Sequence, residues 1–363
     1  MLLKENKTYF IKPNHCGGPS PKLDPIVVRD NKVKKIETTL ILDTNILIKI
    51  EKIVKNGNKW SDVRDYGLGN LVKLLQKCPP KSICLSPALA LKEMPPQRAA
   101  NATIAYEEFC TKYLGFEDTP NSTNKSYEGT YDEYGFKDLS ISAQQVLVIP
   151  YLSFLYLNYV YRFIKGSPLD RFKAYIDLIE EKVDVLSATE LEIAKYCFFD
   201  LTNITDKSTK VFIQKIRENS VNFVPYKKNP RLPNSSTELQ KTAFNAANDV
   251  HLLQAANMGD GKFLDGIKQD CWVATLDKKL ASFCTVFYQL NINGEVQPYS
   301  VSTLPEAIND LEYWNATHEY FSLKSLNRRD YNHSRSLDLD KLLMAVDEAT
   351  LKIENAFKNL ELN

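Results

Sequence analysis

The sequence predicts an α/β fold with a mainly parallel sheet flanked by helices. Short apolar runs alternate along the chain with segments whose apolar residues recur at helical spacing. Two of these runs, residues 40–42 and 272–274, are each followed within a few residues by an aspartate and then by a helical pattern. Such a junction is typical of a buried parallel strand that leads into a helix, and open α/β sheets bind their ligands at that edge.

The order of the elements suggests the domain organisation. Residues 1–36 are polar and proline-rich, so we expect an N-terminal arm that is partly irregular. Residues 37–300 carry the strand and helix pattern of the main domain, and a mostly helical insertion interrupts it at about residues 110–240. Residues 301–363 show helical patterns and are expected to form a C-terminal helical extension.

An uncharged stretch at residues 139–161 lies inside the insertion. Its length alone suits a membrane span. The stretch also contains Gln144, Gln145, Pro150, Asn158 and several tyrosines, whose polar groups are costly in lipid. We therefore expect a helix that is buried in the protein or at a subunit contact, and no association with a membrane.

Net charge and cysteine content limit the expected binding behaviour and location of the protein. The 46 basic and 45 acidic residues leave a formal net charge of +1, so no general attraction holds this chain to nucleic acid, although a local basic groove is compatible with that total. The seven cysteines form no Cys-x-x-Cys motif, and the first residues lack the apolar core of a signal peptide. A reducing, cytoplasmic location is the simplest expectation.

Four acidic residues occur where a ligand site would be expected. Asp43 and Asp277 follow apolar strands, Glu93 lies about two turns into the helix that follows residues 82–85, and Asp249 lies in a helix rich in small residues. Three of them have an ordinary alternative, whereas an aspartate at position 249 in such a helix has little structural reason. The two strand-end aspartates suit helix N-caps, and a helical glutamate usually belongs to a solvated face.

Taken in order, Asp43-Thr44-Asn45, Glu93, Asp249 and Thr275-Leu276-Asp277 resemble the motifs of the PIN-domain family of metal-dependent nucleases. That family has an Asp-Thr-Asn after its first strand, a helical Glu, a helical Asp before alanine-rich turns, and a Thr-x-Asp after a late strand. The interval between Glu93 and Asp249 is much longer than the resemblance leads one to expect, which is the reason for predicting an insertion.

The resemblance implies an endonuclease that cleaves phosphodiester bonds, with RNA as the expected substrate. Asp43, Glu93, Asp249 and Asp277 would bind Mg²⁺ or Mn²⁺, which prefer oxygen ligands, and activated water would attack the phosphorus. Thr44, Asn45 and Thr275 are expected to orient carboxylates or water. A basic, proline-punctuated loop offers phosphate contacts at Lys227, Lys228 and Arg231.

A second interpretation belongs to a different class. In it the PIN-like fold is a nucleic-acid-binding or protein-interaction module without catalytic activity, and the large additions bind partners. The near-zero net charge and the long insertion leave room for it. Under either interpretation, the insertion or the C-terminal helices would contact a protein partner or a second copy of the chain.

Overall fold

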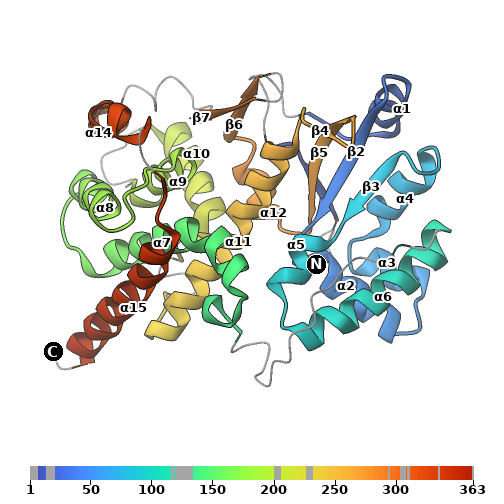
Figure 1. Ribbon diagram of the computed structural model, residues 1–363, viewed down its shortest axis with the longest axis horizontal. Helices are drawn as coiled ribbons and strands as arrows, with labels where there is room; N and C mark the ends of the chain where they lie inside the picture. Colours follow the sequence, from blue (N-terminus) through green and yellow to red (C-terminus); the bar gives the residue numbers. More distant parts are fainter. Residues whose placement is uncertain are drawn as a thin grey trace. The chain divides into compact units, whose positions relative to one another are not determined.

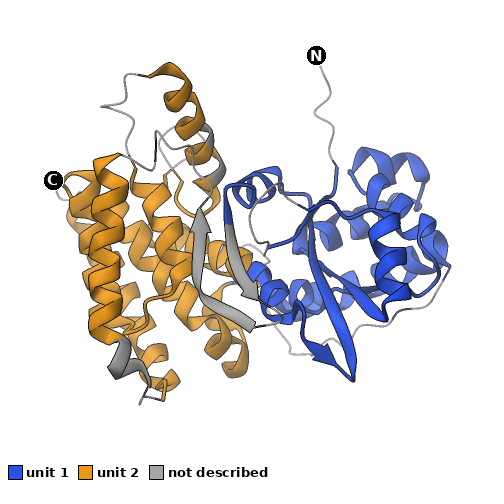
Figure 2. Ribbon diagram, turned by 90° about the horizontal axis from the view of Figure 1, so that it is seen from above, with its two compact units in different colours: residues 1–134, 252–297 blue, residues 135–251, 298–363 orange. Residues whose placement is uncertain are grey.

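The computed structural model describes residues 7–13, 21–115, 118, 134–199, 206–225, 232–292, 295–302, 308, 311–333 and 336–361. The chain divides into two compact units (Figure 2). Unit 1 comprises residues 1–134 and 252–297, and unit 2 comprises residues 135–251 and 298–363. The C-terminal helices therefore share a unit with most of the predicted insertion, whereas residues 110–134 belong to unit 1.

The sheet of unit 1 has the strand order β1-β5-β2-β3, and β4 pairs with β5 outside this path (Figure 1). Central strand β2 is parallel to both β3 and β5, whereas β1 and β4 are antiparallel to β5. The predicted α/β class and the parallel core of the sheet are confirmed. The sheet as a whole is mixed, because β4 and edge strand β1, which the segment expected as an arm supplies, are antiparallel to β5. The bounds are β1 (Tyr9–Ile11), β2 (Ile36–Leu42), β3 (Ile83–Ser86), β4 (Phe263–Leu264) and β5 (Ile267–Thr275).

Helices of unit 1 cover this sheet with apolar side chains. In α2 the residues Ile46, Leu47, Ile50 and Ile53 recur at helical spacing, and none is more than 1% exposed. They join the β2 side chains in one buried cluster, and α2 packs against α5 and α6. The helices are α1 (Pro25–Val33), α2 (Thr44–Lys55), α3 (Trp60–Asp65), α4 (Gly69–Lys77), α5 (Ala88–Glu93), α6 (Pro96–Leu114) and α12 (Lys278–Phe283).

The last turn of α11 (Ser236–Gly259) approaches β5 very closely. A Cβ atom at Gly259 would lie 2.9 Å from the Cys271 Sγ atom, so this contact requires a glycine. The chain then turns back through Asp260, whose carboxylate accepts a hydrogen bond from the Cys271 backbone N–H at 2.9 Å. The final turn of α11 is thus joined to the first half of β5.

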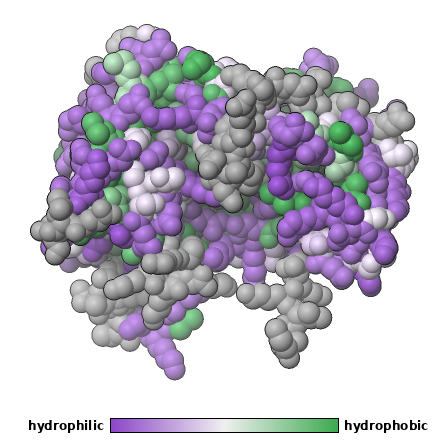
Figure 3. Space-filling view, turned by 90° about the horizontal axis from the view of Figure 1, so that it is seen from below, coloured by the Kyte–Doolittle hydropathy of each residue, from purple (hydrophilic) through white to green (hydrophobic). Residues whose placement is uncertain are grey.

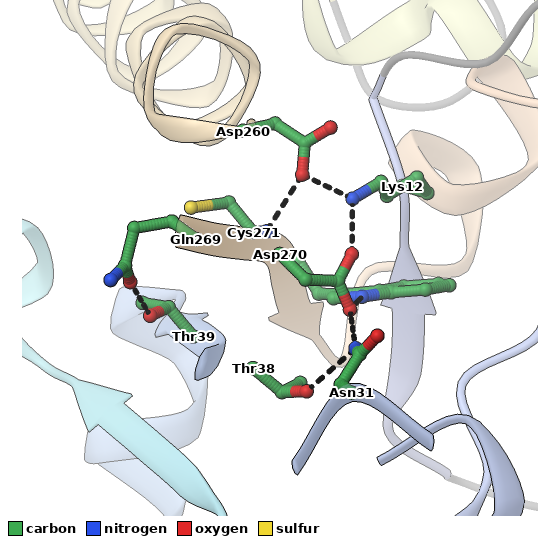
Figure 4. A network of polar contacts seen from close by, with 9 residues as sticks. Lys12, Asn31, Thr38, Thr39, Asp260, Gln269, Asp270 and Cys271 are labelled. Carbon is green, nitrogen blue, oxygen red and sulfur yellow. Dashed lines mark hydrogen bonds and ion pairs between the residues drawn. The ribbon is translucent and has the colours of Figure 1, made fainter. Parts of the chain in front are cut away.

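A network of ion pairs and hydrogen bonds lies beside the first half of β5 (Figure 4). The Lys12 ammonium contacts Asp260 and lies 2.5 Å from Asp270 Oδ1, and it sits 5.3 Å from the centre of the Trp272 ring. Asp270 Oδ2 also accepts hydrogen bonds from Asn31 Nδ2 at 2.6 Å and from the Trp272 indole N–H at 2.8 Å. The network joins β1, α1 and β5 to the residue that follows α11.

Unit 2 is helical in the residues that the structure describes, apart from its share of a small hairpin. The hairpin strands, β6 (Phe287–Ile292) and β7 (Glu295–Ser302), form a separate two-stranded sheet. The helical elements are η1 (Phe136–Asp138), α7 (Ile141–Phe163), α8 (Pro168–Lys182), α9 (Ala188–Phe198), α10 (Lys207–Asn219), η2 (Ser220–Asn222), most of α11, α14 (Glu312–His333) and α15 (Leu339–Glu361).

Helix α7 contains residues 141–161 of the uncharged stretch that the sequence singles out and ends two residues later, with Arg162 in its last turn. Among the described residues it is the one helix long and apolar enough to cross a membrane, judged by length and composition, and 67% of its most apolar window is buried inside the structure. It packs against α8, α9 and α15. Buried Asn158 donates to the carbonyl oxygens of Phe154 at 2.9 Å and Phe223 at 3.0 Å. The predicted burial of this aromatic-rich helix is therefore confirmed.

The surface is predominantly polar on the face that Figure 3 shows, with apolar residues in small groups. Exposed apolar side chains in such small groups are normal for a folded domain.

Candidate active site

The ends of β2 and β5 place two aspartates at one edge of the sheet. Asp43 is the N-cap of α2 and Asp277 is the N-cap of α12. Because β2 and β5 are adjacent and parallel, their carboxyl ends meet, and the Asp43 backbone N–H donates to the Ala274 carbonyl oxygen at 3.0 Å. Both aspartates do cap their helices, as the ordinary alternative expects. Asp277 Oδ1 accepts from two backbone N–H groups, those of Lys279 at 2.6 Å and Leu280 at 3.1 Å.

Asn45 and Thr275 join the two junctions into one hydrogen-bonded unit. The Asn45 amide nitrogen donates to Asp43 Oδ2 at 2.5 Å and to the Thr275 hydroxyl at 3.1 Å, and the Asn45 amide oxygen accepts from the Leu276 N–H at 3.0 Å. The Thr275 hydroxyl donates to Asp43 Oδ2 and accepts from the Asp277 N–H at 2.9 Å. Thr275 is fully buried. The position of Asp43 relative to Asp277 is therefore fixed by side chains as well as by the sheet.

Glu93 reaches the same edge from the end of α5. The hydroxyl of Thr44, the residue after Asp43, donates a hydrogen bond to Glu93 Oε2 and lies 3.4 Å from the Ala90 carbonyl oxygen. Helices α2 and α5 pack against each other, and α5 also packs on β2. Within the described part of the chain Glu93 Oε1 has no hydrogen-bond partner, and the residue is half-buried. One oxygen of this carboxylate is thus held and the other is open to a ligand.

The charges at this edge repel one another. Burial is the largest cause that raises the pKa of Asp43, to about 6, and the charge of Asp277 raises it further, against hydrogen bonds from Thr275 and Asn45 that lower it. Burial raises the pKa of Glu93 to about 7, with a further contribution from Asp43, while the Thr44 hydrogen bond lowers it. Neither Asp43 nor Glu93 forms an ion pair with any residue that the structure describes.

The remaining predicted site residues have different positions. Asp249 is half-buried on α11, in the portion of that helix that belongs to unit 2. Its approach to the three carboxylates of unit 1 stays a prediction. Lys227, Lys228 and Arg231 lie outside the described residues. Over the described ranges, no group of three or more His, Cys, Asp or Glu side chains is close enough to form a ready-made metal site.

One neighbour of the site escaped the sequence analysis. Tyr9 on edge strand β1 pairs directly with Thr275, and the charge of Asp277 contributes, after burial, to a raised pKa of the Tyr9 phenol. The available signal was the run Tyr9-Phe10-Ile11, an aromatic and apolar triplet inside a polar segment. Three residues are too few to establish strand periodicity.

Comparison of the chain with models of protein families, with curated proteins and with solved structures finds no match. The functional assignment therefore depends on the geometry of this edge and on the motif resemblance. Chemically, the edge offers several carboxylate oxygens held by neutral donors, an arrangement suited to a hard cation or to proton transfer.

Proposed function

We propose that the chain is a metal-dependent endonuclease that hydrolyses phosphodiester bonds, with RNA as its substrate. One observation carries the proposal. At the carboxyl end of the sheet, burial raises the pKa of Asp43 and Glu93, the charge of Asp277 raises that of Asp43 further, and the charge of Asp43 raises that of Glu93 further. Carboxylates crowded in this way are usually neutralised either by protons or by a cation.

The donor atoms are of the kind that Mg²⁺ or Mn²⁺ binds, although the described side chains are not yet grouped closely enough to hold an ion. All candidate ligands are carboxylate oxygens, which hard divalent ions prefer, and the side chains that position them are hydroxyl and amide groups. Asp43 Oδ1 has only a long contact of 3.3 Å to the Asn45 N–H among the described residues, and Glu93 Oε1 has none. A bound divalent ion would supply a water of lowered pKa and would neutralise charge that develops on the phosphate.

The residues of the chain prepare the site for that chemistry. Asn45 and Thr275 hold Asp43 Oδ2 and leave Oδ1 turned to its weaker contact. Thr44 holds Glu93 Oε2 in the same way. Fixed side chains of this kind reduce the entropy lost when substrate and ligands are brought together. The motif resemblance supplies RNA as the substrate and Asp249 as a fourth carboxylate, and each of these can be tested by its own experiment.

The first test is cleavage of single-stranded RNA, tRNA and single-stranded DNA in Mg²⁺ or Mn²⁺, with and without EDTA. We expect wild-type cleavage that EDTA abolishes, with RNA as the better substrate. Asp43→Asn and Asp277→Asn should each lower the rate on the order of a thousandfold, because each removes a ligand charge. Asp249→Asn tests the fourth position. Asp65→Asn, an exposed carboxylate on α3, is the matched control.

The outcomes distinguish the two functional classes. Cleavage that is equal in all variants and insensitive to EDTA would contradict the metal-site assignment. RNA binding without cleavage under any condition would favour the binding-module interpretation.

A second test needs no turnover. Adding Mn²⁺ to the folded protein at pH 7.5 should raise the melting temperature, because an ion that binds only the native state stabilises it. Asp43→Asn and Glu93→Gln should lose most of that increase, whereas Asp65→Asn should retain it. An equal increase in all four proteins would place the Mn²⁺ elsewhere.

A further inference from the structure

The start of the described chain passes along the proposed active site. Strand β1 pairs with β5 in antiparallel register, with Tyr9 opposite Thr275. Side chains of directly opposed residues lie on the same face of a sheet, with Cβ atoms about 4.5–5.5 Å apart. Thr275 is the residue whose hydroxyl contacts Asp43 and the Asp277 N–H. Tyr9 is therefore the neighbour of this network on the edge-strand side, and β1 also packs against α12.

Lys7 lies beside Tyr9. Its ammonium nitrogen is 5.5 Å from the centre of the Tyr9 ring, and the residue is exposed. Alternate residues of an extended segment point to the same side, so positions 7 and 9 both project toward the face that carries the Thr275 hydroxyl. The negative charge of Asp277 contributes to the raised pKa of Tyr9, which agrees with a phenol near that carboxylate.

The backbone between these two residues is firmly held. The Thr8 N–H donates to Asn70 Oδ1 at 3.0 Å, the Thr8 carbonyl oxygen accepts from Asn70 Nδ2 at 2.6 Å, and the Thr8 hydroxyl donates to the Gly67 carbonyl oxygen at 3.0 Å. Thr8 itself is buried. A fixed Thr8 presents Lys7 and Tyr9 on the opposite side without further ordering of the chain, which lowers the entropic cost of binding.

A cation next to an aromatic ring suits the edge of an acidic site that binds nucleic acid. The carboxylates repel a polyanion, so the substrate requires a positive charge close by and a surface for an unstacked base. We propose that Lys7 and Tyr9 contact single-stranded nucleic acid at this site, with the Tyr9 ring stacking on a base and the Lys7 ammonium pairing with a phosphate. This inference rests on the proposed function and adds two substrate-binding residues to it.

The test compares variants of this pair in cleavage and in binding. Tyr9→Ala should raise KM for single-stranded RNA on the order of tenfold with little change in kcat, because one stacked base is lost. Tyr9→Phe keeps the ring and should restore most of the binding that Tyr9→Ala loses. Lys7→Ala should raise KM several-fold and make the dependence of log Kd on log salt shallower by about 0.7, the value for one phosphate contact on a single strand.

Lys49→Ala is the matched control. Lys49 also lies over a tyrosine ring, 5.4 Å from the centre of Tyr66, on a part of unit 1 to which the proposal gives no role in binding. Its KM and salt dependence should equal those of wild type. Should Tyr9→Ala fail to fold, the exposed Lys7→Ala variant carries the test.

Binding in EDTA, measured as fluorescence anisotropy of labelled RNA, separates the two proposals. Cleavage by the wild type together with Lys7 and Tyr9 variants that match Lys49→Ala would overturn this inference alone. Binding that depends on Lys7 and Tyr9 without any cleavage would support the inference while the catalytic proposal fails. Neither binding nor cleavage would overturn both.

Discussion

Strand β5 carries acidic clusters at both ends, and their surroundings differ in one respect. At its first half, Lys12 lies between Asp260 and Asp270, and all three side chains are 12–17% exposed. At its last residue, Thr275 hydrogen-bonds Asp43 beside Asp277, and the described partners of the Asp43 carboxylate are an amide, a hydroxyl and one backbone N–H. One cluster contains its own counter-charge, and Asp43 in the other has none among the described residues.

The difference shows how to separate structural from functional acids in this molecule. A carboxylate paired with a largely buried ammonium is neutralised by the fold itself, so removal of that ammonium would leave uncompensated charges beside β5. Asp43 is buried without a counter-charge among the described residues, so burial and the charge of Asp277 raise its pKa although the hydrogen bonds from Thr275 and Asn45 lower it. Under the proposed function, a carboxylate of the second kind would be neutralised by a proton or by a cation from solution.

The largest expected effect on stability comes from removing the internal counter-charge. Lys12→Met keeps the apolar stem over Trp272 but leaves Asp260 and Asp270 without their ammonium partner. Breaking a buried pair from one side costs on the order of 3 kcal/mol of unfolding free energy, reduced somewhat here by partial exposure. Urea unfolding at pH 7.5 measures it.

The control for Lys12→Met is Lys137→Met. Lys137 pairs with Asp347 at 2.6 Å, but the two side chains are 60% and 69% exposed, so the loss should stay below about 1 kcal/mol. If Lys12→Met lost as little unfolding free energy as Lys137→Met, the ion pairs of Lys12 with Asp260 and Asp270 would not be important for stability.

A smaller effect is expected in the pH dependence of the unfolding free energy, through Asp43 and Glu93. The folded pKa values of Asp43, about 6, and Glu93, about 7, exceed the ordinary values of 3.8 and 4.5. The native state therefore binds protons more tightly than the unfolded state. The stability from these groups is fully present below their ordinary pKa values and is lost as pH rises through the folded values, about 6 for Asp43 and about 7 for Glu93. The loss is on the order of 1–3 kcal/mol per carboxyl.

Urea unfolding in EDTA between pH 4.5 and 8 checks this sign. Asp43→Asn and Glu93→Gln should be more stable than wild type at pH 8, and the advantage should vanish near pH 4.5. Asp65→Asn should follow the wild-type curve. Variants that are less stable than wild type at pH 8 would show that the carboxylates are not strained by their own charge.

The smallest effect is expected from the neutral donors. Thr275→Val preserves shape but removes the hydroxyl that contacts Asp43, Asn45 and the Asp277 N–H, at a cost of about 1–2 kcal/mol. Thr103→Val is the matched control, since Thr103 is also buried and its hydroxyl donates only to the Ala99 carbonyl oxygen. A larger loss in Thr103→Val than in Thr275→Val would contradict a special role for the network.

Much of unit 1 was determined by local sequence. Residues 40–42 and 272–274 lie in strands, and Asp43 and Asp277 begin helices, because apolar runs and capping side chains act within a few residues of one another. The placement of Thr44, Asn45 and Thr275 next to carboxylates followed from the same junctions. The approach of Glu93 to Asp43 was predicted from the motif resemblance rather than from any local pattern.

Tertiary structure alone decided the rest. Edge strand β1, the pairing of Tyr9 with Thr275 and the position of Lys12 between Asp260 and Asp270 join segments about 250 residues apart in sequence, and no periodicity within either segment encodes such a contact. Whether an aspartate is a cap, half of an ion pair or a charged ligand depends on which donors surround it in space. Burial and neighbouring charges set its pKa, and both are properties of the folded chain.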